Sequence, residues 1–346
     1  MLNTFNISDL TKKQVVEAKN GVSKNVLVSV CIQTFNHGNY IKACLDGMLI
    51  QQTDFEFEIL LGEDASTDAT RKICIEYAEK HPDKIRLFLH HRENNIKVGG
   101  NPTGRFNFLY NLSKAQGKYV AICEGDDYWT DPLKLQKQVD ILEADSSIAM
   151  VYSDAATITD GTLGAFYKED QRPKGVFNLH KYLYEFQVFG VPTCTSMLRA
   201  DVMKAAQSFL FRHADKVISA DFAMWAIAGK FGNYHFLEDK TAVRRKHSTG
   251  IMGTLGGTRA WFEAGIHLNH ALAKELGPST HASFYDGDWW YYMELSFWDL
   301  KEKKWGHSVR HLAKSLLAAG RSSKNNRIQI LRDYFYRLRQ GFSGKN

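Results

Sequence analysis

The stretch "KYVAICEGDDYWTDP" at residues 118–132 places three acidic residues directly behind a run of apolar residues. A short continuous run such as "YVAIC" (119–123) is typical of a strand that is buried on both faces of a sheet. Glu124, Asp126 and Asp127 follow within four positions. Carboxylates this close together repel one another unless a cation or a changed ionisation compensates. The stretch therefore predicts a buried strand that ends in a polar site.

Four further apolar runs predict the rest of a parallel sheet. They are "VLVSVCI" (26–32), "FEILL" (57–61), "IRLFL" (85–89) and "IAMVY" (148–152). Helical periodicity separates several of them, in the segments 41–49, 73–78 and 135–142. Asp131, which precedes Pro132, is expected to cap the helix over 135–142. Strand–helix–strand repetition predicts an α/β fold with a mostly parallel central sheet flanked by helices.

Three polar segments are expected to meet at one edge of this sheet. "QTFNHGNY" (33–40) follows the first run, "GEDASTDAT" (62–70) follows the second, and the acidic stretch follows the fourth. Ligands of open α/β sheets bind beyond the carboxyl ends of the strands. Hard divalent cations such as Mg²⁺ and Mn²⁺ take oxygen ligands and bridge to phosphates. A solvated acidic turn is the alternative, but the position behind a buried strand favours a cation site.

Composition indicates an ordinary globular protein. The chain has 346 residues, of which 44% are hydrophobic and 24% are charged. Its five cysteines are scattered and form no C-x-x-C pair, which predicts reduced thiols and a cytoplasmic location. The first residues lack the pattern of a signal peptide, and no apolar run reaches the roughly 18 residues of a membrane span.

Three blocks together resemble glycosyltransferase family 2. They are "VSVCIQTFNHGNYIKACLDGMLIQQ", "FEILLGEDASTDAT" and "GKYVAICEGDDYWTDPLKLQKQVDILE", in the order and spacing of that family. The resemblance covers roughly residues 26–250 and implies a GT-A, Rossmann-like, nucleotide-diphospho-sugar transferase fold. We therefore expect an N-terminal extension over 1–25, a catalytic domain over 26–250 and a C-terminal helical extension over 251–346.

The resemblance also implies roles for residues behind the first two strands. Thr34 and Asn36 match positions near the base and ribose of the nucleotide. Asp64 matches the acidic residue that contacts the base or ribose. The family commonly has two aspartates and a glycine at that point, whereas this chain has Glu63, Asp64 and Ala65.

The acidic stretch matches the "DXD"-type region that holds the metal ion and the diphosphate. Asp126 and Asp127 are expected to be the working pair, because Glu124 replaces the usual first aspartate. "RRKHSTG" (244–250) resembles the family's arginine-x-histidine segment, here Arg245 and His247. The resemblance implies that His247 is a third contact to the metal or the diphosphate, whereas a surface histidine is the plain alternative.

Two further roles come from segments that match the family more loosely. In "NNIKVGGNPTGRFN" (94–107), Arg105 or Lys97 is expected to meet the diphosphate, and a simple turn is the alternative. Asp221 in "ISADFAMW" is expected to be the general base, although an aspartate at a helix start is also a standard cap. Asp215 and Glu185 are the weaker candidates for the base.

The expected function is metal-dependent, inverting transfer of a sugar, with Mn²⁺ or Mg²⁺, in the synthesis of a surface polysaccharide. The donor is expected to be a UDP-sugar, and the acceptor a glycan or a lipid-linked sugar. An inactive module that binds nucleotide-sugars is one alternative. A sugar nucleotidyltransferase is another, but such enzymes begin with a Gly-rich phosphate loop that "TFNHGNY" lacks.

The C-terminal region is strongly basic. Residues 301–346 contain 12 Lys and Arg against two acids. One face of the predicted helix carries Val309, Leu312, Leu316 and Ala319, so the first interpretation is a helical subdomain with a solvated basic rim. A peripheral contact with the inner face of the membrane is the alternative. No recognition motif supports nucleic acid as a partner.

Overall fold

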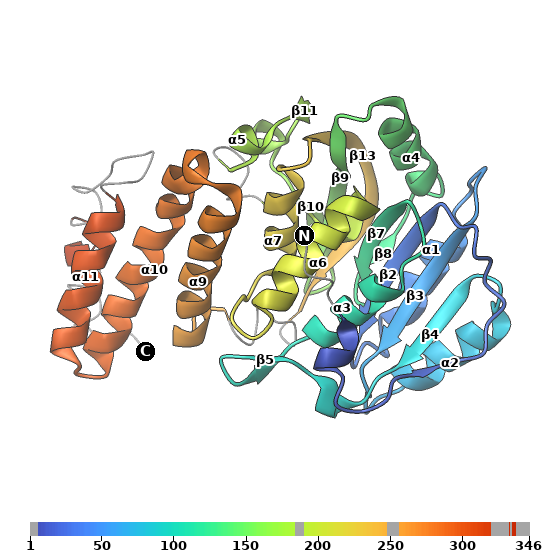
Figure 1. Cartoon of the computed structure of the whole chain (residues 1–346), viewed down its shortest axis with the longest axis horizontal. Helices are drawn as coiled ribbons and strands as arrows, with labels where there is room; N and C mark the ends of the chain where they lie inside the picture. The colour runs from blue at the N-terminus through green and yellow to red at the C-terminus, as the bar shows by residue number, and fades with distance from the viewer. Residues whose placement is uncertain (1–5, 184–189, 248–255, 320–331, 333, 337–346) are drawn as a thin grey trace. The chain divides into compact units, whose positions relative to one another are not determined.

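The structure is a computed structural model that describes residues 6–183, 190–247, 256–319, 332 and 334–336. It divides into two compact units, shown in Figure 1. The first unit consists of residues 1–215 and 220–254, and the second of residues 216–219 and 255–346.

The first unit contains an eleven-stranded sheet whose parallel half agrees with the sequence. Strands β4 (Ile85–Leu89), β3 (Phe57–Glu63), β2 (Val28–Thr34) and β7 (Tyr119–Glu124) lie side by side and parallel. The apolar runs are buried on both faces, which explains their continuous pattern. The prediction of a mostly parallel α/β sheet is confirmed.

The other half of the sheet is mixed. β12 (Met197–Arg199) runs antiparallel between β7 and β9 (Ile148–Thr159), and β13 (Asn233–Lys246) runs parallel to β9. β1 (Val16–Glu17) and β11 (Gly175–Phe177) form the edges, β10 (Thr162–Ala165) pairs with β9, and β8 (Tyr128–Trp129) pairs with β13. A separate ribbon joins β5 (Lys97–Val98) to β6 (Asn101–Pro102).

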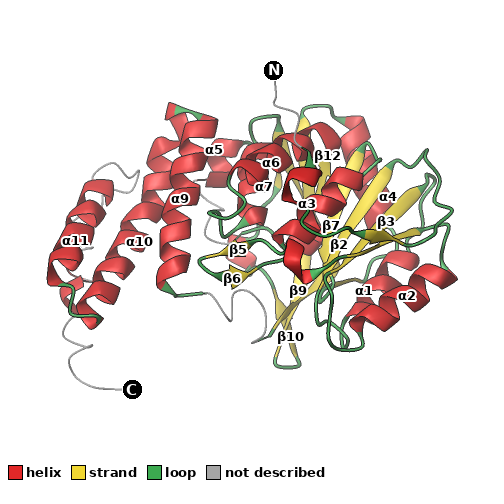
Figure 2. Cartoon of the chain, turned by 60° about the horizontal axis from the view of Figure 1, so that its bottom comes forward, coloured by secondary structure: helices red, strands yellow, loops and turns green. Residues whose placement is uncertain are grey.

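Helices cover both faces of the sheet. Figure 2 shows α1 (Ile41–Leu49) and α2 (Thr70–Lys80) on one face, and α3 (Arg105–Lys114) and α6 (Ala200–Arg212) on the other. The unit also contains α4 (Lys134–Ala144), α5 (Leu179–Lys181), α7 (Ala220–Ala228) and the short 3₁₀ helices Ile7–Leu10, Arg92–Asn94, Glu169–Gln171 and Thr193–Thr195.

Two predictions about these helices are wrong. Asp131 does not cap α4, because the helix begins at Lys134 and Leu133 occupies the cap position. Asp131 instead accepts the backbone N–H of Leu133 at 2.9 Å, in the turn before the helix. The segment 94–107 is also more than a loop, since α3 begins at Arg105.

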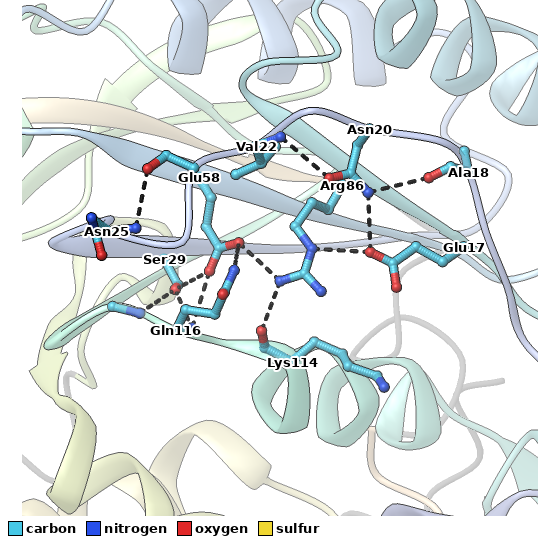
Figure 3. Close-up of polar contacts among 12 residues, drawn as sticks. Glu17, Ala18, Asn20, Val22, Asn25, Ser29, Glu58, Arg86, Lys114 and Gln116 are labelled. Atoms are coloured by element: carbon cyan, nitrogen blue, oxygen red, sulfur yellow. Dashed lines mark hydrogen bonds and ion pairs between the residues drawn. The ribbon is translucent and has the colours of Figure 1, made fainter.

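A buried polar network stabilises the amino-terminal end of the parallel strands. Glu58, at the start of β3, is fully buried. Its carboxylate accepts hydrogen bonds from Ser29 Oγ at 2.6 Å, Arg86 Nη1 at 3.0 Å and Gln116 Nε2 at 3.1 Å, as Figure 3 shows. Glu17 pairs with the same arginine at 3.0 Å. These partners satisfy the hydrogen-bonding capacity of the buried carboxylate.

Lys134 is a second buried charge, and it predicts a measurable pH dependence. Its Nζ lies 4.1 Å from the centroid of the Trp129 ring and donates to Gln138 Oε1 at 2.7 Å. Burial lowers the pKa of Lys134 from 10.5 to about 7, although Cys123, Cys194 and Asp131 oppose the shift. The unfolded chain therefore holds this proton more tightly than the folded chain does.

The free energy of unfolding of the wild type is expected to rise with pH above about 7. From about pH 7 to about pH 9 the gain relative to Lys134→Met is expected to be about 2 kcal/mol. Urea unfolding of the wild type and of Lys134→Met across this pH range measures the difference in their free energies of unfolding. An equal pH dependence of the two proteins would contradict the assignment of the shift to Lys134.

The described part of the second unit contains helices α9 (Arg259–Leu276), α10 (His281–Lys301) and α11 (Trp305–Ala319), with a 3₁₀ turn at Pro278–Thr280. Buried carboxylates of α10 are paired: Asp288 with His270 at 2.8 Å, and Asp299 with Arg259 and His311, each at 2.7 Å. Among the described residues, no helix is both long and apolar enough to cross a membrane.

Candidate active site

Thr34, Asp64 and Glu124 lie at the same edge of the sheet. Thr34 pairs with Glu63 across β2 and β3, and Gln33 pairs with Glu124 across β2 and β7. Because these strands are parallel neighbours, the polar segments behind them meet at their carboxyl ends. The predicted gathering of these segments is therefore confirmed.

Asp64 is a buried carboxylate with only one oxygen satisfied. It is 3% exposed, and its Oδ2 accepts from Arg92 Nη1 and from Asn95 Nδ2 at 3.1 Å. Burial raises the pKa of Asp64 to about 6, even though Arg92 and Asn95 favour the ionised form. Asp64 Oδ1 has no partner among the described residues. Arg92 also lies 3.9 Å from the centroid of the Phe35 ring. The site therefore offers an unused hydrogen-bond acceptor, Asp64 Oδ1, near the stacked Arg92 guanidinium and Phe35 ring.

Asn36 joins the loops behind β2 and β3. Its backbone is left-handed, with φ 53°; its N–H donates to Ser66 Oγ, and its Oδ1 accepts from Thr67 N, both at 2.9 Å. Thr34 is buried, and its Oγ1 has no partner among the described residues. A Cβ at Gly125 would lie 2.7 Å from that oxygen, so a glycine is needed for the acidic turn to pack here.

The end of β13 and the residue after it form hydrogen bonds with the acidic turn. Asp126 Oδ2 lies 2.9 Å from His247 Nε2, and Asp127 Oδ1 accepts the backbone N–H of Arg245 at 2.7 Å. Arg245 Nη1 donates to the Asp126 carbonyl oxygen, and its guanidinium lies 4.4 Å from the centroid of the Tyr128 ring. The fold thus brings "EGDD" and "RRKH" together from positions about 120 residues apart in the chain.

The repulsion among the three acids is relieved by unequal ionisation. Burial, together with Asp126, raises the pKa of Asp127 to about 7. Burial and both aspartates raise the pKa of Glu124 well above its usual range. Although burial opposes it, the hydrogen bond from His247 and the nearby charge of His37 hold the pKa of Asp126 below its ordinary value. Asp126 is therefore the acid of the cluster whose ionised form is favoured most.

The acidic turn could hold a metal ion only together with ligands from a bound molecule or water. Among the described residues, no three His, Cys, Asp or Glu side chains are arranged to enclose an ion. Magnesium usually binds one or two carboxylates together with water and substrate phosphates, so the Asp126 carboxylate could hold such an ion if phosphate oxygens and water complete its ligand set. One oxygen of Asp127 is already occupied by the Arg245 amide. Glu124 Oε2 is buried without a described partner.

Asp221 lies near the acidic turn, and Arg105 lies near Asp221. Asp221 is half-buried in the first turn of α7, and its charge contributes to the raised pKa of Glu124. Arg105, the first residue of α3, is 4% exposed and donates to the Ala214 carbonyl at 3.4 Å. Burial lowers the pKa of Arg105 to about 10, and Asp221 opposes the shift.

Lys97 was the alternative contact to the diphosphate, and Asp215 and Glu185 were the alternative bases. Lys97 is exposed on β5, and Asp215 is exposed before α7. Glu185 lies outside the described residues.

Sequence reasoning missed two site residues, Arg92 and His37. Arg92 follows β4, the neighbour of β3, so its position behind a strand was the available signal. His37 belongs to "QTFNHGNY", and its ring centroid lies 6.3 Å from that of His247.

This sheet, with its polar carboxyl edge and paired acidic turn, defines a GT-A nucleotide-diphospho-sugar transferase fold. The crystal structure of Staphylococcus aureus TarS 1–349 has the same fold, with a TM-score of 0.59 and 16% identity over 91% of this chain and 92% of that chain. A second structure of TarS 1–349, in complex with UDP-GlcNAc, gives a TM-score of 0.59 at 17% identity over the same shares.

The model of glycosyl transferase family 2 matches residues 29–205, and the chain belongs to this family. An uncharacterized protein of Mycobacterium tuberculosis is 42% identical over 136 residues, which are 37% of this chain and 37% of that protein. The chain thus spans little more than a third of the length of that relative. The dTDP-rhamnosyl transferase RfbG of Shigella flexneri is 24% identical over 296 residues, which are 78% of this chain and 94% of RfbG.

Proposed function

We propose that this protein transfers a sugar from a nucleotide-diphospho-sugar to a hydroxyl acceptor, with a divalent metal ion and with inversion at the anomeric carbon. The observation that carries the proposal is the pairing of Asp126 with His247 at the carboxyl edge of β2 and β7. Asp221 lies close enough to this turn to contribute to the raised pKa of Glu124, which supports a place for it beside the proposed metal site.

The donor nucleotide is proposed to bind behind β2 and β3. Asp64 Oδ1 is an unused, buried acceptor for an N–H or O–H of the base or ribose, and Phe35 with Arg92 provides a flat surface beside it. Thr34 lies beside the acidic turn, next to Gly125, and Asn36 bonds to the loop behind β3. A UDP-sugar is the proposed donor; RfbG is named for a dTDP-sugar, which makes that class the first alternative.

The diphosphate is proposed to lie at the acidic turn, with Arg105 beneath it. Asp126 and His247 would hold Mn²⁺ or Mg²⁺, and Asp127 would orient the turn and reach the ion through its second oxygen. When bound, such an ion stabilises negative charge on the departing diphosphate. Arg245 keeps the turn in place through its amide and guanidinium, because each makes a hydrogen bond to the turn.

Asp221 is proposed to be the general base. A carboxylate that takes the proton of the acceptor hydroxyl makes the oxygen nucleophilic as it attacks the anomeric carbon. Attack from the face opposite the diphosphate inverts that carbon.

The acceptor is proposed to be a glycan or a lipid-linked sugar in the synthesis of a surface polysaccharide. TuaG of Bacillus subtilis, named as a putative teichuronic acid biosynthesis glycosyltransferase, is 30% identical over 136 residues and supports an acceptor of this general kind. An inactive module that binds nucleotide-sugars would share the donor site, but it would not turn the donor over.

A donor screen tests the proposal. The protein is incubated with UDP-, dTDP- and GDP-sugars, with and without Mn²⁺ or Mg²⁺, and release of the nucleoside diphosphate is measured. We expect metal-dependent release from at least one pyrimidine nucleotide-sugar. Binding of a donor without release, in the presence of sugar acceptors, would favour the inactive module. Release of pyrophosphate from a nucleoside triphosphate and a sugar phosphate would indicate a nucleotidyltransferase.

A further inference from the structure

Helix α11 presents an apolar stripe to solvent. Trp305 is 63% exposed, Val309 69% and Leu317 62%, and Ala313 between them is exposed as well. A spacing of four residues shifts each position by about 40° around the helix, so the four side chains form one continuous, slanting stripe. Val309 was expected in the packed stripe with Leu312, but it points away from it.

The opposite face of α11 is held firmly within the second unit. Ser308 and Ser315 are buried; the hydroxyl of Ser296 bonds to the Ser308 carbonyl at 2.8 Å, and Ser315 Oγ donates to the Trp289 carbonyl at 2.7 Å. The outward stripe is therefore a property of a packed helix and not of a loosely attached one.

Basic residues border the stripe. Arg310 and Lys314 are exposed on α11, and Lys301, Lys303 and Lys304 are exposed just before it. Residues 301–346 together have 12 Lys and Arg against two acids. Apolar side chains that include a tryptophan, next to a basic face, are typical of a helix that lies in a membrane interface.

We propose that the exposed face of α11 docks on an anionic lipid bilayer, with Trp305, Val309 and Leu317 in the headgroup region and Arg310 and Lys314 against the lipid charges. A symmetric second copy fits less well, because it would bring two strongly basic faces together. A soluble acidic polymer would match the charges but would leave the apolar stripe in water. The inference does not depend on the proposed glycosyl transfer.

Vesicle binding of the full chain tests the proposal. Co-sedimentation compares vesicles of phosphatidylcholine with vesicles that also contain phosphatidylglycerol, at low and high salt. We expect binding only to the anionic vesicles, weakened by salt. Arg310→Gln combined with Lys314→Gln is expected to weaken binding about 30-fold, and Trp305→Ala with Val309→Ser at least about tenfold.

Leu163→Ser is the matched control, because Leu163 is 65% exposed in the first unit, on β10. It should bind like the wild type. A second readout requires no destabilising change: brominated lipids should quench tryptophan fluorescence less in Trp305→Phe than in the wild type.

Several outcomes would overturn the proposal. They are absence of binding to anionic vesicles, unchanged binding of the Trp305 and Val309 variant, or unchanged quenching in Trp305→Phe. Polyglutamate that binds as tightly as vesicles would assign the face to an acidic polymer. A dimer in light scattering that Val309→Ser converts to a monomer would assign it to a second copy.

Discussion

Asp221→Asn is expected to lower kcat by about three orders of magnitude while the affinity for the donor changes by less than about twofold. The amide has the shape of the carboxylate but cannot take a proton from the acceptor. Asn also remains a good residue at a helix start, so α7 should form as before. Single-turnover transfer and equilibrium binding of the donor separate the two effects.

Asp215→Asn is the matched control, since Asp215 lies six residues earlier and is exposed. It should retain wild-type kcat. If Asp215→Asn loses transfer and Asp221→Asn keeps it, the base has been assigned to the wrong residue. Loss of donor binding in Asp221→Asn would instead place Asp221 at the donor.

Asp126→Asn is expected to weaken metal-dependent donor binding by about 100-fold and to lower kcat/KM by at least about 1,000-fold. Asp126 is the one acid of the cluster whose pKa is lowered, so its substitution removes the negative charge that a cation would meet. His247→Ala should have a smaller effect in the same direction. Calorimetric titration with UDP, with and without Mn²⁺, measures the binding part.

Asp140→Asn serves as the control, because Asp140 is an exposed acid on α4. Its binding and turnover should match those of the wild type. Donor binding by Asp126→Asn at wild-type strength would show that the ion, if one is used, lies elsewhere.

The parallel strands could be predicted because each is a short, mostly apolar run. Residues 57–61 and 119–123 are buried on both faces, and the carboxyl-end rule then placed Asp64 and Glu124 at one edge. Local sequence patterns decide where such buried strands begin and end, so a single sequence is enough to predict them.

Helix α3 was missed because burial hides its period. All eight residues from Arg105 to Leu112 are buried, so no polar face alternates with an apolar one. Asn107 and Asn111 lie on the side that faces the sheet, where they donate to the carbonyls of Gly62 at 2.7 Å and Ile32 at 2.9 Å. Buried amides that satisfy strand carbonyls look like surface residues in a sequence.

The details of the acidic turn depend on contacts between distant residues. The hydrogen bond from the Arg245 amide to Asp127, and the pair formed by Asp126 and His247, arise because β13 runs beside β9 and β8. No local sequence pattern indicates which residues of distant strands lie side by side. The distinction between Asp126 as the acid whose ionised form is favoured most and Asp127 as the buried acceptor of a backbone N–H therefore required the structure.

The most direct test is a crystal structure of the full chain with UDP and Mn²⁺, using anomalous scattering to locate the manganese. The account predicts an anomalous peak between the diphosphate and the Asp126 carboxylate, with the base or ribose beside Asp64. UDP bound with its diphosphate at another surface, and no manganese at the acidic turn, would contradict it.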